Sequence, residues 1–211
     1  MRVVRSGWRY GLPPLLVAPP LTLVSPPLGI ACFVLGVAIL LFFRDPPRTP
    51  PEAGIVSPAD GRVSLIRSEG ERIRVGVFMN VTDVHVNRSP VSGEVTAVRH
   101  RAGAHRPAFS KDSDRNERVT LPIVGTESAV EVALIAGTVA RRITPYVDDG
   151  DEVERGQRIG HIAFGSRADV LLPPEVNRED VAVTIGQRVR AGETRLVHPK
   201  AHDPNTTRSE R

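Results

Sequence analysis

The sequence predicts a mainly β fold, a small barrel or sandwich with an approximate internal twofold repeat, preceded by an apolar helical hairpin. Three observations support this prediction. After residue 54 the chain consists of short β-branched runs of period two, separated by glycine and proline. Two short motifs each occur twice within that region. The first fifty residues instead contain a long stretch without charge.

The charge of the chain is concentrated at its N-terminus. The net charge is +4, and residues 1–50 carry all of it, since the remaining 161 residues hold 23 basic and 23 acidic groups. A nucleic-acid-binding domain should carry a basic face, so the balance argues against a nucleic-acid partner. The single cysteine, Cys32, excludes an intrachain disulfide and a multi-cysteine zinc site, and we predict no metal site.

The uncharged stretch runs from Gly11 to Phe43. Its proline-free part, Leu28 to Phe43, has 16 residues. As a helix it would be about 24 Å long, shorter than a bilayer core of about 30 Å. Arginine and aromatic side chains border both ends, as is typical of membrane interfaces. We expect residues 1–48 to form a hairpin anchor in the cell membrane with both ends cytoplasmic, a re-entrant or interfacial anchor being the alternative.

The anchor and the β domain are joined by a proline-rich connector. Four of the six residues 46–51 are proline, which predicts a stiff, extended segment. The β domain is expected to span residues 49–198. Residues 199–211 are polar and predict a disordered tail.

The repeated motifs predict paired tight turns. Ser-Pro-x-x-Gly-x-Val occurs at residues 57–63 and 89–95, and Gly-x-x-Val-x-x-Gly occurs at 150–156 and 186–192. Each combines glycine turns with one inward valine. The patterns resemble the barrels of biotinyl and lipoyl carrier domains. A carrier needs an exposed lysine on a hairpin, and neither lysine of this chain lies between matching strands, so we expect the architecture without the carrier function.

Three segments hold the candidate catalytic residues: 56–61, 78–90 and 161–169. Taken singly, each has a structural interpretation, because Asp60 and Ser166 sit in turn sequences and His85 lies within a strand pattern. Together, an Asp, a His and a Ser would also suit a serine hydrolase. No Gly-x-Ser-x-Gly elbow surrounds Ser166, which disfavours an α/β-hydrolase.

Taken together, the segments resemble the phosphatidylserine decarboxylase family in its short form. The matching motifs are Ser57-Pro58-Ala59-Asp60-Gly61, Asp83-Val84-His85-Val86-Asn87-Arg88-x-Pro90 and Phe164-Gly165-Ser166. The polar stretch 108–118 and the Phe-Phe-Arg-Asp-Pro sequence that follows the apolar stretch are similar to the family as well. The resemblance covers residues 8–197, and the order and spacing of the motifs make it specific.

The resemblance implies a proenzyme that cleaves itself between Gly165 and Ser166. Ser166 Oγ would attack the Gly165 carbonyl, and elimination and loss of ammonia would convert Ser166 into a pyruvoyl group. The chains 1–165 and 166–211 would stay together as a heterodimer. The pyruvoyl group would form a Schiff base with the amine of a serine-headgroup phospholipid and accept electrons as carbon dioxide leaves. The product would be an ethanolamine phospholipid.

Family logic also implies roles for individual residues. A histidine oriented by an aspartate would activate the serine, here His85 and Asp60. Longer bacterial forms have a second histidine three positions later, where this chain has Arg88. Either His85 serves both self-cleavage and later protonation, or another group helps. His161, otherwise a surface strand residue, is the nearest such group.

Four further residues are candidates for binding the substrate. Arg88 could hold the phosphate through a bidentate contact, and Asn87 lies beside it. Lys111 and Arg118 belong to the charged segment 99–118, which is either a solvated loop or a flap over the head group.

Two other functions stay open at this point. A membrane-anchored barrel could act as a non-enzymatic adaptor, and the Asp60, His85 and Ser166 set could belong to a serine hydrolase. Ester-linked phosphatidylserine and ether-linked archaetidylserine share the reacting head group, so the sequence does not distinguish them. Oligomerisation beyond the heterodimer is also left open.

Overall fold

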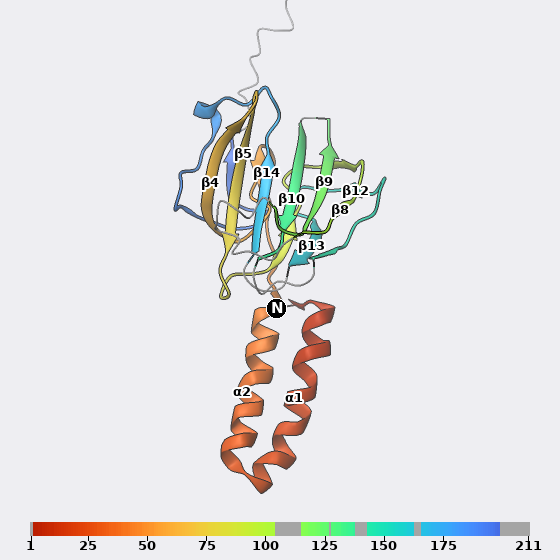
Figure 1. The fold of residues 1–211 in the computed structure, drawn as a ribbon, viewed down its shortest axis with the longest axis vertical. Coiled ribbons are helices and arrows are strands. Elements are labelled where there is room, and N and C mark those ends of the chain that lie inside the picture. Colours follow the sequence, from red (N-terminus) through yellow and green to blue (C-terminus); the bar gives the residue numbers. More distant parts are fainter. Residues whose placement is uncertain (1, 104–114, 127, 138–142, 163–165, 199–211) are drawn as a thin grey trace, which may run out of the picture.

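The computed structural model describes residues 2–103, 115–126, 128–137, 143–162 and 166–198 (Figure 1). The expected disordered tail, Lys111 and Gly165 therefore lie outside the described residues. Two helices stand apart from a β domain, and the proline-rich connector joins the second helix to that domain.

The helices α1 (Arg5–Val24) and α2 (Pro26–Phe42) run antiparallel side by side (Figure 1). Glycines let their backbones approach closely, since a Cβ added at Gly36 would lie 2.5 Å from Leu15 Cγ. Strands β1 (Arg2–Val3) and β2 (Arg44–Asp45) pair at the base of this helix pair. No described helix combines the length and hydropathy needed to cross a membrane.

The β domain contains one large antiparallel sheet. Its strands are β4 (Gly61–Glu69), β5 (Arg72–Met79), β7 (Gly93–Val95), β8 (Arg99–Arg101), β9 (Arg118–Val124), β10 (Ala129–Ile135), β12 (Glu152–Val153), β14 (Ser166–Leu171) and β15 (Arg188–Val189). The order is β12-β7-β9-β10-β14-β5-β4-β15, with β8 pairing to β9. The many strands confirm the predicted mainly β class. The order of the large sheet is open at both ends, so the predicted barrel or sandwich is not confirmed.

Smaller sheets complete the domain. Strands β11 (Ile143–Pro145), β13 (Arg158–Ile162) and β6 (Val86–Arg88) form a three-stranded sheet in that order, and β16 (Arg195–Val197) pairs with β3 (Ile55–Val56). A short 3-10 helix, η2 (Arg178–Asp180), follows β14. One hydrophobic cluster joins the sheets, because it includes Leu121 and Leu134 of the large sheet and Ile159 and Ile162 of the small one. The alternation of buried residues along β9 matches the predicted period of two.

The repeated motifs make corresponding contacts. Val63 accepts a backbone hydrogen bond from Gly186 (2.7 Å) and donates one to the carbonyl of Gln187 (3.0 Å). Val95 likewise accepts one from Gly150 (2.8 Å) and donates one to the carbonyl of Asp151 (2.8 Å). Both valines are at most 1% exposed. Each copy of the first motif is thus paired with one copy of the second, which is the internal repetition indicated by the sequence.

Candidate active site

Ser166 is the first residue of β14 and is fully buried. Its Cα partner is Met79, the last residue of β5. Ser166 Oγ donates to Met79 Sδ at 3.9 Å. The C-terminal end of β5 points toward the helix pair (Figure 1). The predicted reacting serine therefore lies at the end of the large sheet that is nearest the helices.

His85 precedes β6 and is 2% exposed. Its Nδ1 lies 2.9 Å from the Asp83 carbonyl oxygen. A carbonyl only accepts hydrogen bonds, so Nδ1 carries the proton and Nε2 presents a lone pair. Nε2 is buried and has no hydrogen-bond partner among the described residues. Burial lowers the pKa of His85 to about 4, which leaves the ring neutral at pH 7 and able to accept a proton.

The end of the helix pair covers His85. The ring of Phe42, the last residue of α2, lies 4.3 Å from the imidazole between ring centroids. The next ring, Phe43, lies 6.1 Å from His161. The sequence predicted an anchor at this position but did not indicate that its final residues pack onto the candidate base.

Asn87 shares the surroundings of Ser166. It is fully buried, and its Nδ2 lies 3.6 Å from Met79 Sδ, the same sulfur that Ser166 contacts. A weaker contact of 3.5 Å joins Nδ2 to the Pro58 carbonyl oxygen. Asn87 Oδ1 has no hydrogen-bond partner among the described residues. Two buried acceptors without partners, on Asn87 and His85, therefore lie close to one another along the chain.

His161 is buried, not a surface strand residue. It lies on β13, where its Cα partner is Val86. Its Nδ1 forms a 2.8 Å hydrogen bond with the Tyr146 hydroxyl. Burial lowers the pKa of His161. The structure therefore places His161 opposite Val86, the residue that follows His85.

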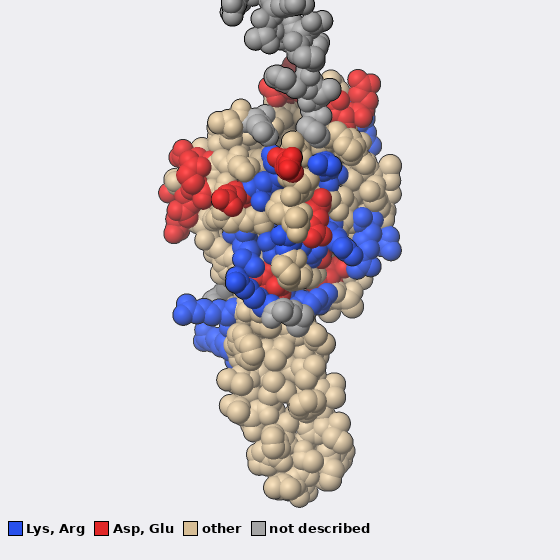
Figure 2. All heavy atoms as spheres, turned by 180° about the vertical axis from the view of Figure 1, so that it is seen from behind, with Lys and Arg blue, Asp and Glu red and all other residues tan. Residues whose placement is uncertain are grey.

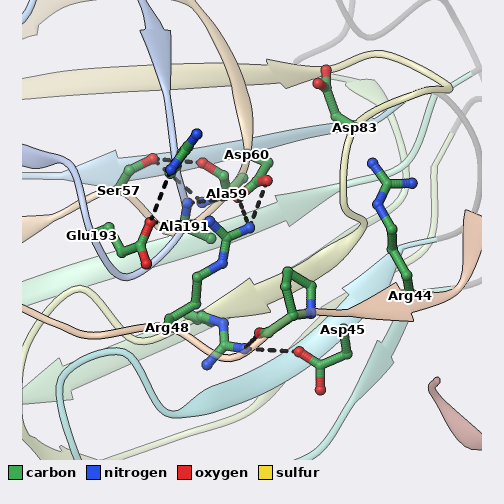
Figure 3. A network of polar contacts seen from close by, with 12 residues as sticks. Arg44, Asp45, Arg48, Ser57, Ala59, Asp60, Asp83, Ala191 and Glu193 are labelled. Carbon is green, nitrogen blue, oxygen red and sulfur yellow. Dashed lines mark hydrogen bonds and ion pairs between the residues drawn. The ribbon is translucent and has the colours of Figure 1, made fainter. Parts of the chain in front are cut away.

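The predicted pairing of Asp60 with His85 is not formed. Arg48 Nη2 donates to both Asp60 carboxylate oxygens at 2.9 and 2.7 Å, and the Ala191 amide donates to Oδ1 at 2.8 Å (Figure 3). In the second copy of the repeated motif, Ser92 stands at the position of Asp60. Ser92 Oγ accepts the equivalent bond from the Arg155 amide at 2.9 Å. Asp60 therefore fastens a turn of the repeat, and His85 is oriented by the Asp83 carbonyl instead.

Arg88 does not face an open phosphate site. It is 6% exposed, and its Nη2 forms a 2.7 Å ion pair with Asp45. The same guanidinium donates to the carbonyl oxygens of Gly156 at 2.8 Å and Pro46 at 3.0 Å. Arg158 also binds Asp45. These protein contacts occupy both terminal nitrogens of Arg88, so the predicted bidentate phosphate contact is not supported.

Arg118 begins β9, opposite Ile135, which in turn pairs with Arg167, the neighbour of Ser166. This register brings Arg118 to the same end of the sheet as Ser166. Residues 99–101 of the charged segment form strand β8 and not a loop, and its residues 104–114 lie outside the described residues.

The connector is fastened to the elements around the site (Figure 3). Arg44 Nη2 donates to the Thr82 carbonyl oxygen at 2.6 Å, next to the segment that orients His85. Asp45 holds Arg88 three residues beyond His85, and Arg48 also reaches Glu193 at 3.2 Å. The helix pair is thus joined to the β domain by a chain segment with several fixed contacts. Sequence analysis predicted its stiffness but not these ion pairs.

The comparisons with known proteins agree with these motifs. The family described as phosphatidylserine decarboxylase matches residues 35–197. The chain belongs to the phosphatidylserine decarboxylase family. A putative archaetidylserine decarboxylase proenzyme of Halobacterium salinarum is 54% identical over 191 residues, covering 90% of this chain and 95% of its own. A phosphatidylserine decarboxylase proenzyme of Thermobifida fusca is 52% identical over 156 residues, covering 74% and 70%.

Membership of the phosphatidylserine decarboxylase family connects the buried residues His85, Asn87 and Ser166 with decarboxylase chemistry. A relative from Methanococcoides burtonii, also named a putative archaetidylserine decarboxylase proenzyme, is 45% identical over 164 residues, 77% of this chain and 76% of its own. The names of these relatives include both phosphatidylserine and archaetidylserine as substrates. The family is one of carboxy-lyases, and these three relatives are named as proenzymes.

Proposed function

We propose that this chain is the proenzyme of a pyruvoyl-dependent decarboxylase that converts phosphatidylserine or archaetidylserine into the ethanolamine lipid and carbon dioxide. One observation carries the proposal. A buried serine in a Gly-Ser motif lies at the same end of the sheets as a neutral histidine whose Nε2 lone pair has no partner among the described residues. Such a histidine is suited to remove a proton from a hydroxyl nucleophile.

Self-cleavage follows from that arrangement. His85 Nε2 takes the Ser166 hydroxyl proton as Oγ bonds to the Gly165 carbonyl carbon. The peptide C–N bond breaks, the amine of residue 166 gains a proton, and an ester links the two chains. Loss of the Cα proton then expels the Gly165 carboxylate and leaves dehydroalanine. Addition of water with release of ammonia gives the pyruvoyl group.

The sheet supports continued association of the two products. After cleavage, β14 would belong to the smaller chain, yet it pairs along its whole length with β5 and from Arg167 onward with β10, both of the larger chain. Strands β15 and β16 of the smaller chain pair with β4 and β3. Backbone ladders on several strands therefore favour a heterodimer that does not separate.

The residues present fit a small uncharged ketone at position 166. Ser166 contacts the Met79 thioether, which the Asn87 carboxamide contacts as well, and no charged side chain is bonded to Ser166 Oγ among the described residues. When formed, the pyruvoyl group supplies a carbonyl that takes up the substrate amine and accepts the electrons released with carbon dioxide. His85 then returns a proton to the substrate carbon that lost the carboxylate, because its Nε2 can carry one.

The helix pair is proposed to hold the enzyme on the membrane that contains its substrate. Its outer side chains are apolar and exposed, among them Leu16 (66%), Leu23 (89%) and Phe33 (55%). Basic side chains gather where the β domain meets the helices (Figure 2). Arg2 and Arg5, at the N-terminal end of the chain, are exposed. Apolar insertion combined with arginines at the surface suits an anionic membrane. A cytoplasmic position of the β domain stays a prediction.

The test is conversion of lipid in vesicles. Purified protein is added to vesicles that contain phosphatidylserine or archaetidylserine, and the ethanolamine lipid is measured by mass spectrometry. The proposal expects product from at least one lipid and none from Ser166→Ala. A self-cleaved protein that converts neither lipid contradicts it. Labelling of an uncleaved protein at Ser166 by a fluorophosphonate would instead assign it to the serine hydrolases.

A further inference from the structure

Asn87 carries a buried polar atom that the fold does not use. The residue is fully buried, and Oδ1 accepts no hydrogen bond from any described residue. Leaving a buried amide oxygen without a donor costs stability, so such groups are rare unless they serve a ligand or a reaction. Nδ2 of the same side chain has only its long contacts with the Pro58 carbonyl and the Met79 sulfur.

Through Nδ2, the Asn87 side chain shares a neighbour with the reacting residue. Asn87 and His85 alternate along one extended segment that pairs with β13, so their side chains leave the same face. Both present an acceptor without a partner, Oδ1 and Nε2. Met79 Sδ contacts Asn87 Nδ2 at 3.6 Å and Ser166 Oγ at 3.9 Å, so both side chains touch the same sulfur atom.

We propose that Asn87 Oδ1 accepts a hydrogen bond from the amino group of the substrate's serine head and holds that amine against residue 166, an inference that rests on the proposed function. An amine is rich in donors, whereas Asn87 Oδ1 and His85 Nε2 are acceptors only. The amine is thus the part of the head group that complements this face.

A neutral acceptor also suits the chemistry better than a carboxylate. A carboxylate beside the amine would stabilise its charged form, in which the nitrogen has no lone pair to react. The nearby acids are engaged elsewhere, since Asp60 binds Arg48 and Asp83 binds Arg188 at 3.0 Å. An amide oxygen orients the amine without holding it as a cation. Amines without N–H groups, such as quaternary ammonium heads, cannot make this bond.

The test compares Asn87→Leu with the parent and with Asn116→Leu. Asn116 is a matched control, because it is a buried asparagine whose Nδ2 is bonded to the Ala136 carbonyl at 2.8 Å. Self-cleavage is read from the intact mass, and hydroxylamine reports whether the ketone is present. Reduction with cyanoborohydride in the presence of phosphatidylserine vesicles links the amine to the smaller chain. The lipid concentration that labels half of that chain reports capture of the lipid amine at residue 166.

We expect Asn87→Leu to cleave itself and to react with hydroxylamine as the parent does. Its half-labelling lipid concentration should rise by about 3- to 10-fold, as expected for a lost hydrogen bond to an uncharged amine. Its melting temperature should equal or exceed that of the parent, since an unsatisfied atom is removed, whereas Asn116→Leu should melt lower.

Three results overturn the inference. Unchanged half-labelling in Asn87→Leu shows that the amide does not bind the amine. An uncleaved Asn87→Leu protein assigns the residue to self-cleavage instead. A melting temperature reduced as far as in Asn116→Leu, with equal labelling of both variants, assigns it to the fold. If the parent fails to react with hydroxylamine, the proposed function itself fails, which is a separate outcome.

Discussion

The ring of Phe42 lies 4.3 Å from the imidazole of His85, inclined by 33°. Phe42 ends the second helix, and His85 is the candidate base for self-cleavage and the candidate proton donor after decarboxylation. The contact therefore places the proposed membrane-binding element directly against the catalytic machinery. It also helps to exclude water from His85, and this burial is the largest cause of its low pKa.

The first prediction concerns that contact. Phe42→Ala should raise the pKa of His85 from about 4 toward the ordinary value of 6.5, because water reaches the imidazole. The measurement is an NMR titration of labelled histidine in protein that also carries Ser166→Ala and therefore stays in one chain. Phe43→Ala is the control, because it removes a ring of the same size that faces His161. An unchanged His85 pKa in Phe42→Ala would show that the ring does not shield it.

The second prediction is a loss of stability in mild acid. A histidine whose pKa falls on folding stabilises the protein fully above pH 6.5 and loses that contribution as the pH falls toward 4. For His85 the loss over this window is about 3 kcal/mol, and His161 contributes with the same sign. Urea unfolding at pH 7 and pH 4.5 measures it. His85→Gln should reduce the difference, and an equal difference in both proteins would refute the assignment.

The third prediction separates two roles for Asp60. If it fastens the turn through Arg48, then Asp60→Asn and Arg48→Met should each destabilise the fold by about 3 kcal/mol, because one partner leaves a largely buried charge unpaired. The double variant should lose much less than the sum. Folded Asp60→Asn should still cleave itself. A variant with parental stability that does not cleave would instead support the catalytic role that the family resemblance implies.

The fourth prediction concerns Arg88. Arg88→Met should destabilise the protein by about 3 kcal/mol, because Asp45 loses a buried partner. Arg190→Met is the control, since that side chain is 72% exposed and should change stability by less than about 0.5 kcal/mol. Denaturant unfolding compares the two. If Arg88→Met is as stable as Arg190→Met but binds lipid poorly, Arg88 contacts the substrate phosphate after all.

The sequence predicted the parts of the fold that depend on local signals. Glycine turns and inward valines recur in the repeats, and Val63 and Val95 are buried as expected. Comparing the two copies could also have revealed the structural role of Asp60, since Ser92 stands at its position. The open order of the large sheet has no such signal, because it depends on which distant strands meet at the edges.

The site was predictable only in part, because contacts between residues far apart in the sequence leave no local signal. The motifs identified Asn87 and Ser166, which both contact Met79 Sδ, and His85, which lies two residues before Asn87. The contacts that define their environment join distant residues, such as Arg48 with Asp60 and Phe42 with His85. Arg88 was assigned to the substrate because an arginine in a motif suggests phosphate binding, whereas its acidic partner lies 43 residues away.

The intact mass of the purified protein, with Ser166→Ala beside it, tests the central claim most directly. The account predicts two chains, 1–165 and 166–211, with the smaller one lighter by one ammonia than its sequence, and a whole Ser166→Ala protein. A single uncut parental chain of 22.9 kDa from a folded, lipid-bound sample would contradict it.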